Sequence, residues 1–349
     1  MSAEETEIEE DPITYYLEDM TYHGKTDRTK AAYGRVLREF ASFLDGRGRR
    51  PETADRRDCL AWIHGIRENH APSTVATYAS YVNRFYGYMT QIGAFEGNPM
   101  GLVMEELPES VDRDPTRREI SLDEMRTFVR SIQHPLDRAV VVILLKTGIR
   151  VGELCNLDLR DVSLSMEGPT GSYEALSSRA SGRERTLFVE SDISRGDRIN
   201  GEPRTAANKR VRDTQIPIDA ELASVLRRWL AIRPDTPSPA EPLFVSTRDA
   251  WGQRLTPEMV RSIVSEYARD HGWYDDGGGA SSNVTPHYFR HFFTTYLRDR
   301  TGDRGIVKYL RGDVADDIID TYTHNWGDRV REVYETEIYA LLSRSVADP

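Results

Sequence analysis

Apolar residues recur at helical spacing along most of the first hundred positions of the chain. In positions 26–44 the members of this pattern are Tyr33, Val36, Leu37, Phe40 and Leu44. The same spacing continues through 55–68 and 73–92 and gives each segment one apolar stripe. No strand-like alternation interrupts this region, so the sequence predicts a small helical bundle that ends near Asn98 and Pro99.

The second half of the chain combines helical patterns with short strands. Ser121 and Glu124 form a capping-box pair that begins a helix. The strongly apolar run 136–146 stops shortly before Gly148, and 168–204 has the Gly-, Ser- and Arg-rich composition of a long loop on a hairpin. The predicted strands are 186–189 and 214–218, and the later predicted helices are 220–232, 257–271, 286–300 and 329–343.

These patterns predict a chain that is mainly α with a small β-hairpin or sheet, which is an α+β fold. Its 349 residues are enough for two domains that each bury a core of their own. The polar segment between them contains two prolines, as is typical of a linker. The predicted divisions are an acidic tail at 1–12, a helical domain at 13–104, a linker at 105–118 and a second domain at 119–349.

The charge balance at first argues against a nucleic-acid partner, because 46 bases face 57 acids and the net charge is −11. Only five of these bases are lysine, which leaves 41 arginines (46 − 5). An acid-rich, lysine-poor composition favours a halophilic source, where about 1 M salt shortens the Debye length to about 3 Å and local contacts decide binding. A GC-rich genome is the alternative reason for so much arginine.

We expect a cytoplasmic protein without a membrane span. No apolar run reaches the roughly 18 residues that a span requires, and the first twelve residues hold six acids and no base, unlike a signal peptide. Cys59 and Cys155 form no CxxC pair, so neither a disulfide framework nor a thiolate zinc site is predicted.

Two arginines lie in segments that suit a phosphate clamp, because a guanidinium grips two oxygens at once and keeps its charge. Arg150 follows the end of the apolar run, with Glu153 three residues later, in TGIRVGELCNL. His287 and Arg290 share one helix face in TPHYFRHFFTTYL, where a threonine cap and a proline begin the helix. Taken singly, each motif is also typical of a surface ion pair or a solvated helix face.

The order of these motifs resembles that of the tyrosine recombinases, the family of phage integrases, Cre and Xer proteins. There the first arginine lies in T-G-x-R-x-x-E-L and the second in H-x-x-R. A Leu-Gly-His segment follows some 23 residues after the second arginine, and the nucleophilic tyrosine comes nine residues further on. The same steps lead here from Arg290 to Asp313 and then to Tyr322. The resemblance spans about residues 120–345, and the N-terminal bundle is similar to the family's core-binding domain.

The resemblance also implies a catalytic lysine. In the family it lies on a β-hairpin, eight residues before a proline that follows Val or Ile, and that count leads here from Pro217 to Lys209. Lys209 would give a proton to the leaving 5′-oxygen, a contribution of about 10²–10⁴-fold. The alternative is a solvated hairpin lysine beside Arg210 and Arg212.

The implied chemistry is transesterification. Arg150 and Arg290 would clamp the scissile phosphate, and His287 would help by hydrogen bonding or as a general base. Tyr322, with an ordinary pKa near 10, would lose its proton on attack and form a 3′-phosphotyrosyl bond. No cofactor, metal or ATP is then needed. A metal nuclease built on the acidic run is the alternative, but these acids share one segment and suit a solvated helix face. The run consists of Asp313, Asp316, Asp317 and Asp320.

Asp313 departs from the family, which has His or Trp at that position. A carboxylate beside a phosphate repels it by about 1 kcal/mol at 4 Å in water, unless it pairs with an arginine such as Arg311 or turns away. Two rival functions therefore stay open, a DNA-binding relative that does not cut and a relaxing topoisomerase of type IB.

Double-stranded DNA is the expected partner, contacted mainly through its phosphates. The predicted DNA-contacting residues are Lys25, Arg28, Lys30, Arg35, Arg38, Arg204, Arg210 and Arg212. The resemblance further implies a homo-tetramer on two DNA sites, with the amphipathic C-terminal helix docked in trans on a neighbouring subunit. Packing of that helix in cis is the alternative.

Overall fold

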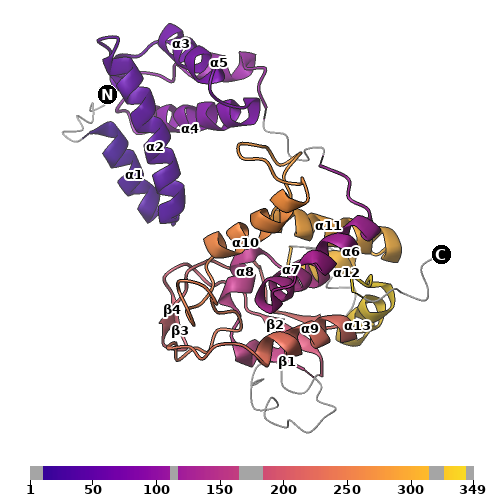
Figure 1. Cartoon of the computed structure of the whole chain (residues 1–349). Helices are drawn as coiled ribbons and strands as arrows, with labels where there is room; N and C mark the ends of the chain where they lie inside the picture. Colours follow the sequence, from indigo (N-terminus) through magenta and orange to yellow (C-terminus); the bar gives the residue numbers. More distant parts are fainter. Residues whose placement is uncertain (1–10, 111–116, 165–183, 314–325, 343–349) are drawn as a thin grey trace. The chain divides into compact units, whose positions relative to one another are not determined.

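The computed structural model describes residues 11–110, 117–164, 184–313 and 326–342 (Figure 1). The chain divides into two compact units, Met1–Pro115 and Thr116–Pro349. Both are mainly helical, and the described strands all belong to the second unit. The mainly helical α+β fold predicted from the sequence is therefore confirmed.

The first unit is a helical bundle built around α4. In its described part α4 contacts α1, α2, α3 and α5, and its Val82 and Phe85 side chains are fully buried. The helices are α1 (Pro12–Tyr22), α2 (Asp27–Asp45), α3 (Arg56–Arg67), α4 (Pro72–Gln91) and α5 (Gly101–Glu106), with a 3₁₀ turn η1 (Pro51–Thr53). Helix α1 precedes the first helix that the sequence predicted. Asp11 caps it, because the Asp11 carboxylate accepts from the Thr14 amide at 2.9 Å.

The second unit is organised around α7 (Pro135–Thr147), the helix of the apolar run. Neighbouring helices cover it on several sides, as a helix with apolar residues all round requires. Those helices are α6 (Leu122–Ser131), α8 (Val151–Asn156), α9 (Ala220–Leu230), α10 (Pro257–Asp270) and α11 (Pro286–Thr301). Figure 1 shows α7 among these helices. The end of α7 and the starts of α8 and α11 therefore lie in one compact region.

A three-stranded antiparallel sheet completes this unit. Its strands are β1 (Val162–Ser163), β2 (Thr186–Val189) and β5 (Thr214–Pro217), in the order β1-β2-β5. A 3₁₀ turn, η2 (Leu159–Asp161), precedes β1, and the short hairpin β3 (Arg198–Ile199) and β4 (Glu202–Pro203) lies in the connection from β2 to β5. This connection carries Lys209.

The described part of the C-terminus packs in cis. Helix α13 (Trp326–Glu337) contacts β5 and α11, and Tyr334, Tyr339 and Leu341 are buried in the core of the second unit. The Tyr334 hydroxyl donates to the Lys146 carbonyl at 2.9 Å. The sequence left both docking in trans and packing in cis open. In the structure of this single chain, residues 326–342 pack against their own second unit.

A buried charge cluster fixes this C-terminal segment. The Lys146 side chain is fully buried, and its Nζ lies 2.6 Å from Asp219 and 2.8 Å from Glu221 while donating to the Tyr339 carbonyl. The Glu221 carboxylate also accepts from the amide of Leu341 at 2.9 Å. One lysine of α7 therefore connects the start of α9 to the segment that follows α13.

We predict that Lys146→Met lowers the free energy of unfolding by about 3–5 kcal/mol, because it leaves two carboxylates without their buried counter-charge. Chemical denaturation of the full chain measures the effect. Lys308→Met, at an exposed position of helix α12 (Arg304–Arg311), is the matched control and should stay near wild type. Equal stability of the two variants would contradict the role given to Lys146.

Candidate active site

Arg150 and Arg290 converge on one oxygen atom. Helix α7 ends at Gly148 in the left-handed conformation, and Arg150 is the N-cap of α8. The Asp313 Oδ1 atom lies 2.8 Å from Nη2 of Arg150 and 2.7 Å from Nη2 of Arg290. Two guanidinium groups that are far apart in the sequence thus hold a single anionic oxygen between them.

The Arg290 guanidinium is fixed by its surroundings. Its side chain is only 3% exposed, and Nη1 donates to the carbonyls of Gly148 at 2.6 Å and of Arg311 at 3.1 Å. A Cβ on Gly148 would lie 2.3 Å from a ring carbon of Phe293, so glycine permits α7 to end directly against α11. Burial, then the charges of Arg150 and Arg311, lower the pKa of Arg290 to about 9, which leaves it protonated at neutral pH.

Asp313 faces the arginines rather than turning away from them. Besides its bonds to Arg150 and Arg290, its second oxygen lies 2.9 Å from Nε of Arg311. The pairing with Arg311 that the sequence offered as the compensating contact is present, together with two further pairings. Because guanidinium groups recognise phosphate and carboxylate oxygens with the same geometry, the Asp313 oxygen occupies the kind of position that a phosphate oxygen needs.

Glu153 supports the arrangement from within α8. Its side chain is fully buried, and it accepts from the backbone amide of Arg150 at 2.9 Å and from Nη1 of Arg150 at 3.0 Å. Arg150 itself is 30% exposed, so it presents its guanidinium at the surface while Glu153 fixes its direction.

His287 lies about one turn before Arg290 on α11 and is exposed on part of its surface. Partial desolvation, then the positive charges of Arg117, Arg290 and Arg311, lower the pKa of His287 below its ordinary value. This shift favours the neutral imidazole, which is able to accept a proton.

Lys209 is exposed, but both of its neighbours are anchored. The Asn208 side chain donates to the Glu190 carbonyl at 2.8 Å and accepts from Asn156 of α8 at 2.9 Å. Arg210 is buried and lies 3.2 Å from Glu153. The backbone of Lys209 is thereby held beside α8, while its ammonium has no ion-pair partner within the described part of the chain.

The structure thus brings Arg150, Arg290 and Asp313 together, with His287 on the same helix as Arg290. Tyr322 lies outside the described residues, as do Asp316, Asp317 and Asp320. The assignment of Tyr322 as nucleophile stays a prediction.

Two of the predicted DNA contacts need correction. Arg204 is 2% exposed and pairs with Asp158 at 2.6 Å, and the Arg210 side chain has no exposed surface, so neither guanidinium is available to a phosphate in this structure. Arg212 is half-buried, with its guanidinium 5.4 Å from the centre of the Tyr309 ring, and Lys30 is half-buried beside Asp27. The predicted contacts on the first unit that are exposed are Lys25, Arg28, Arg35 and Arg38.

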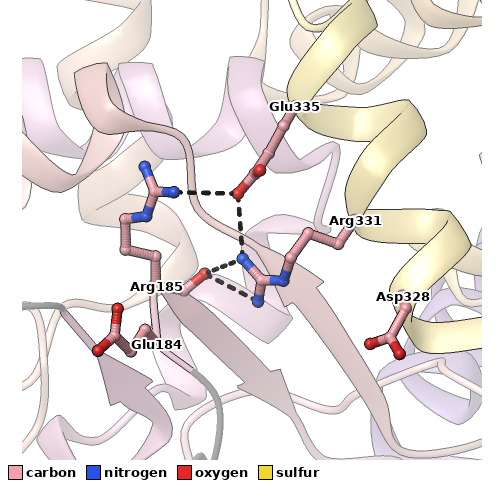
Figure 2. Close-up of a pocket in the computed structure, with 5 residues that line it drawn as sticks. All are labelled: Glu184, Arg185, Asp328, Arg331 and Glu335. Atoms are coloured by element: carbon pink, nitrogen blue, oxygen red, sulfur yellow. Dashed lines mark hydrogen bonds and ion pairs between the residues drawn. The ribbon is translucent and has the colours of Figure 1, made fainter.

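A surface pocket at the start of β2 shares no residue with the arginine pair. Figure 2 shows Arg185 and Arg331 both directed at the Glu335 carboxylate, at 3.3 and 3.2 Å. Arg331 also donates to the Arg185 carbonyl at 3.4 Å. These bonds join the start of β2 to α13, so the charged residues that line the pocket serve to hold the two elements together.

The described ranges contain neither a candidate metal centre nor a helix that could span a membrane. No group of His, Cys, Asp or Glu there is arranged to hold a metal ion. None of the described helices combines the length and apolar character needed to cross a bilayer.

Known proteins resemble this chain over most of its length. The model of the phage integrase family matches residues 189–328, a range that includes Lys209, His287, Arg290, Asp313 and Tyr322. Tyrosine recombinase XerD of Listeria innocua is 26% identical over 321 residues, which cover 89% of this chain and 93% of the relative. Tyrosine recombinase XerC of Roseiflexus castenholzii is 30% identical over 305 residues, 85% of this chain and 82% of the relative.

Solved structures share the fold. The Tn1549 transposon integrase in complex with a circular intermediate DNA has a TM-score of 0.65 at 18% identity, covering 93% of this chain and 98% of that one. A lambda integrase dimer bound to a COC′ core site has a TM-score of 0.58 at 15% identity, covering 90% and 77%. With 30% identity to a tyrosine recombinase over most of both chains, and the same fold, this chain belongs to the phage integrase family of tyrosine recombinases.

Proposed function

We propose that this tyrosine-type site-specific recombinase cuts and rejoins duplex DNA through a 3′-phosphotyrosyl bond to Tyr322. The observation that carries the proposal is the single anionic oxygen held between Arg150 and Arg290. A scissile phosphate needs two such guanidinium groups to offset the negative charge that develops on its oxygens. In the DNA complex, a phosphate oxygen would take the place of the Asp313 carboxylate.

The reaction is a balanced exchange of one phosphate ester for another. The Tyr322 oxygen forms a bond to phosphorus while the bond from phosphorus to the 5′-oxygen breaks. Lys209 supplies the proton that the 5′-oxygen acquires, and the Tyr322 proton passes to His287 or to water. Attack of a 5′-hydroxyl on the phosphotyrosine reverses these steps and rejoins DNA, so no external energy source is required.

The wider assembly is part of the same proposal. The exposed bases of the first unit, such as Arg28 and Arg38, would contact DNA phosphates, and the Tn1549 and lambda integrases were both solved with DNA. As the family resemblance implies, four copies would assemble on two duplexes. Docking of the C-terminal helix in trans would first have to release Tyr334 and Tyr339 from the core of their own subunit.

We place the protein in the cytoplasm of a salt-loaded cell, and the support for this is its composition. Acids exceed bases by 11 (57 − 46), and arginine replaces nearly all lysine. At high ionic strength, long-range repulsion of DNA by this negative charge is screened, and the local arginine contacts remain.

A nicked suicide duplex tests the proposal. Wild-type protein should become covalently attached to DNA in the presence of a metal chelator, and Tyr322→Phe should lose the adduct while still binding DNA. Tyr22→Phe, at an exposed tyrosine of the first unit, is the control and should form the adduct. Binding without any adduct in wild type would favour the non-cutting relative. Relaxation of plasmids that lack a target site would instead favour a topoisomerase.

Replacing Asp313 should raise activity and lower stability. We expect Asp313→His to form adduct about five- to tenfold faster, because a competing charge worth about 1 kcal/mol or more no longer opposes the phosphate. The melting temperature should fall, because Arg150, Arg290 and Arg311 lose their shared counter-charge. Single-turnover rates and thermal unfolding measure the two effects. A slower reaction in a folded variant would show that Asp313 orients the arginines for catalysis.

The pH dependence should report on His287. Because its pKa is lowered, the ring stays neutral to a lower pH than an ordinary histidine, and it can accept the Tyr322 proton until pH falls through that value. Adduct formation should therefore decline only on the acidic side of the ordinary histidine range. His287→Gln should slow the reaction and remove this acidic limb. An unchanged limb in His287→Gln would assign it to another group.

A further inference from the structure

Arg210 holds three parts of the second unit together. Its side chain is completely buried, its Nη2 lies 3.2 Å from Glu153 of α8, and its Nη1 donates to the Leu310 carbonyl of α12 at 3.2 Å. Lys209 precedes it directly in the chain. A single guanidinium thus ties the Lys209 segment to the helix that begins at Arg150 and to the helix that ends just before Asp313.

Close backbone approaches on both sides leave this arrangement little freedom. A Cβ on Gly312 would lie 2.5 Å from Cγ of Arg210, and a Cβ on Gly152 would lie 2.7 Å from the Ala207 carbonyl oxygen. Gly312 also has φ = 66°, a conformation that glycine adopts without strain. Helix α8 and the end of α12 can therefore approach residues 207–210 only because glycine occupies both positions.

The burial of the Arg210 charge costs free energy, so a buried arginine at this position calls for a reason other than packing. Desolvation lowers the pKa of Arg210, the Glu153 carboxylate opposes this effect, and the buried Nε has no hydrogen-bond partner among the described residues. Glu153 is not available to Arg210 alone, because it also pairs with Arg150 at 3.0 Å. Apolar side chains of similar volume often replace both members of a buried ion pair without loss of stability, so packing alone does not account for an arginine here.

We infer that Arg210 is a positioning residue that sets the distance between Lys209 and the phosphate held by Arg150 and Arg290. This inference rests on the role proposed above for Lys209 as the proton donor. Because Asn208 is anchored to α8 as well, the backbone on both sides of Lys209 is fixed relative to the clamp. Without the Arg210 side chain, the backbone that follows Lys209 should become free to move, while Arg150 keeps its own bond to Glu153.

A substrate with sulfur in place of the bridging 5′-oxygen separates proton donation from phosphate binding. A thiolate leaves without a proton, because thiols are far more acidic than alcohols. On the oxygen substrate, we expect Lys209→Ala to slow single-turnover adduct formation by about 10²–10⁴-fold and Arg210→Met by a smaller factor of about 10–10²-fold. Both variants should approach the wild-type rate on the sulfur substrate, whereas Arg150→Ala should be slow on both.

Each outcome decides a different point. If Arg210→Met is equally slow on both substrates while Lys209→Ala is rescued, Arg210 acts on the clamp or the fold, and the inference is wrong. If Lys209→Ala is not rescued, Lys209 is not the proton donor, and the inference falls together with that part of the proposed function. If Arg210→Met reacts like wild type on the oxygen substrate, no positioning role exists.

Two further variants guard against trivial causes. Arg210→Gln keeps a donor for the Leu310 carbonyl and should show the same rescue, which provides a second measurement if Arg210→Met does not fold. Arg198→Met, at an exposed arginine of the β3–β4 hairpin, should match wild type on both substrates. Melting temperatures of all variants establish that each comparison is made on folded protein.

Discussion

Repulsion between guanidinium groups is the constraint on which the candidate site depends. Arg150, Arg290 and Arg311 converge on a small region, and like charges 4 Å apart near a protein surface repel by about 4 kcal/mol. Such a cluster exists before DNA arrives only because carboxylates offset it. Asp313 does so between the three arginines, and Glu153 does so behind Arg150. In the proposed function, the substrate phosphate takes over the counter-charge that Asp313 supplies in the structure.

Helix α7 of the second unit helps to hold these charged side chains in place. Helix α7 ends at Gly148, whose carbonyl accepts from Arg290, so the most buried helix of the unit fixes the less exposed of the two clamp arginines. The same helix carries Lys146, whose buried ion pairs attach the C-terminal segment. Helix α7 therefore contributes both to core packing and to the geometry of the site.

Local signals in the sequence predicted most of the helices and both strands of the main hairpin. The capping box at Ser121 begins α6, and the run after residue 135 forms α7, because capping and apolar periodicity act over a few residues. The grouping of Arg150 with Arg290 came from the resemblance to the tyrosine recombinases, and the structure brings these two side chains together. Tyr322 lies outside the described residues, and its role as nucleophile stays a prediction.

The sequence did not predict which arginines pair with acids far away along the chain. In a chain with so many arginines, nothing local distinguishes the buried Arg204 and Arg210 from solvated ones, because burial depends on acids such as Asp158 and Glu153 that lie some fifty residues away. The orientation of Asp313 has the same origin. Helix α1 has a capped start at Asp11, but it follows an acidic stretch that conceals the signal.

The sharing of Glu153 has a consequence for how this segment can evolve. Arg150 and Arg210 bond to the same carboxylate group, so a change in one alters the electrostatic field felt by the other, and substitutions at the two sites are energetically coupled rather than additive. Relatives that lack a basic residue at position 210 would need a different occupant of this space. Substitutions at positions 153, 210 and 312 should therefore covary among close homologues.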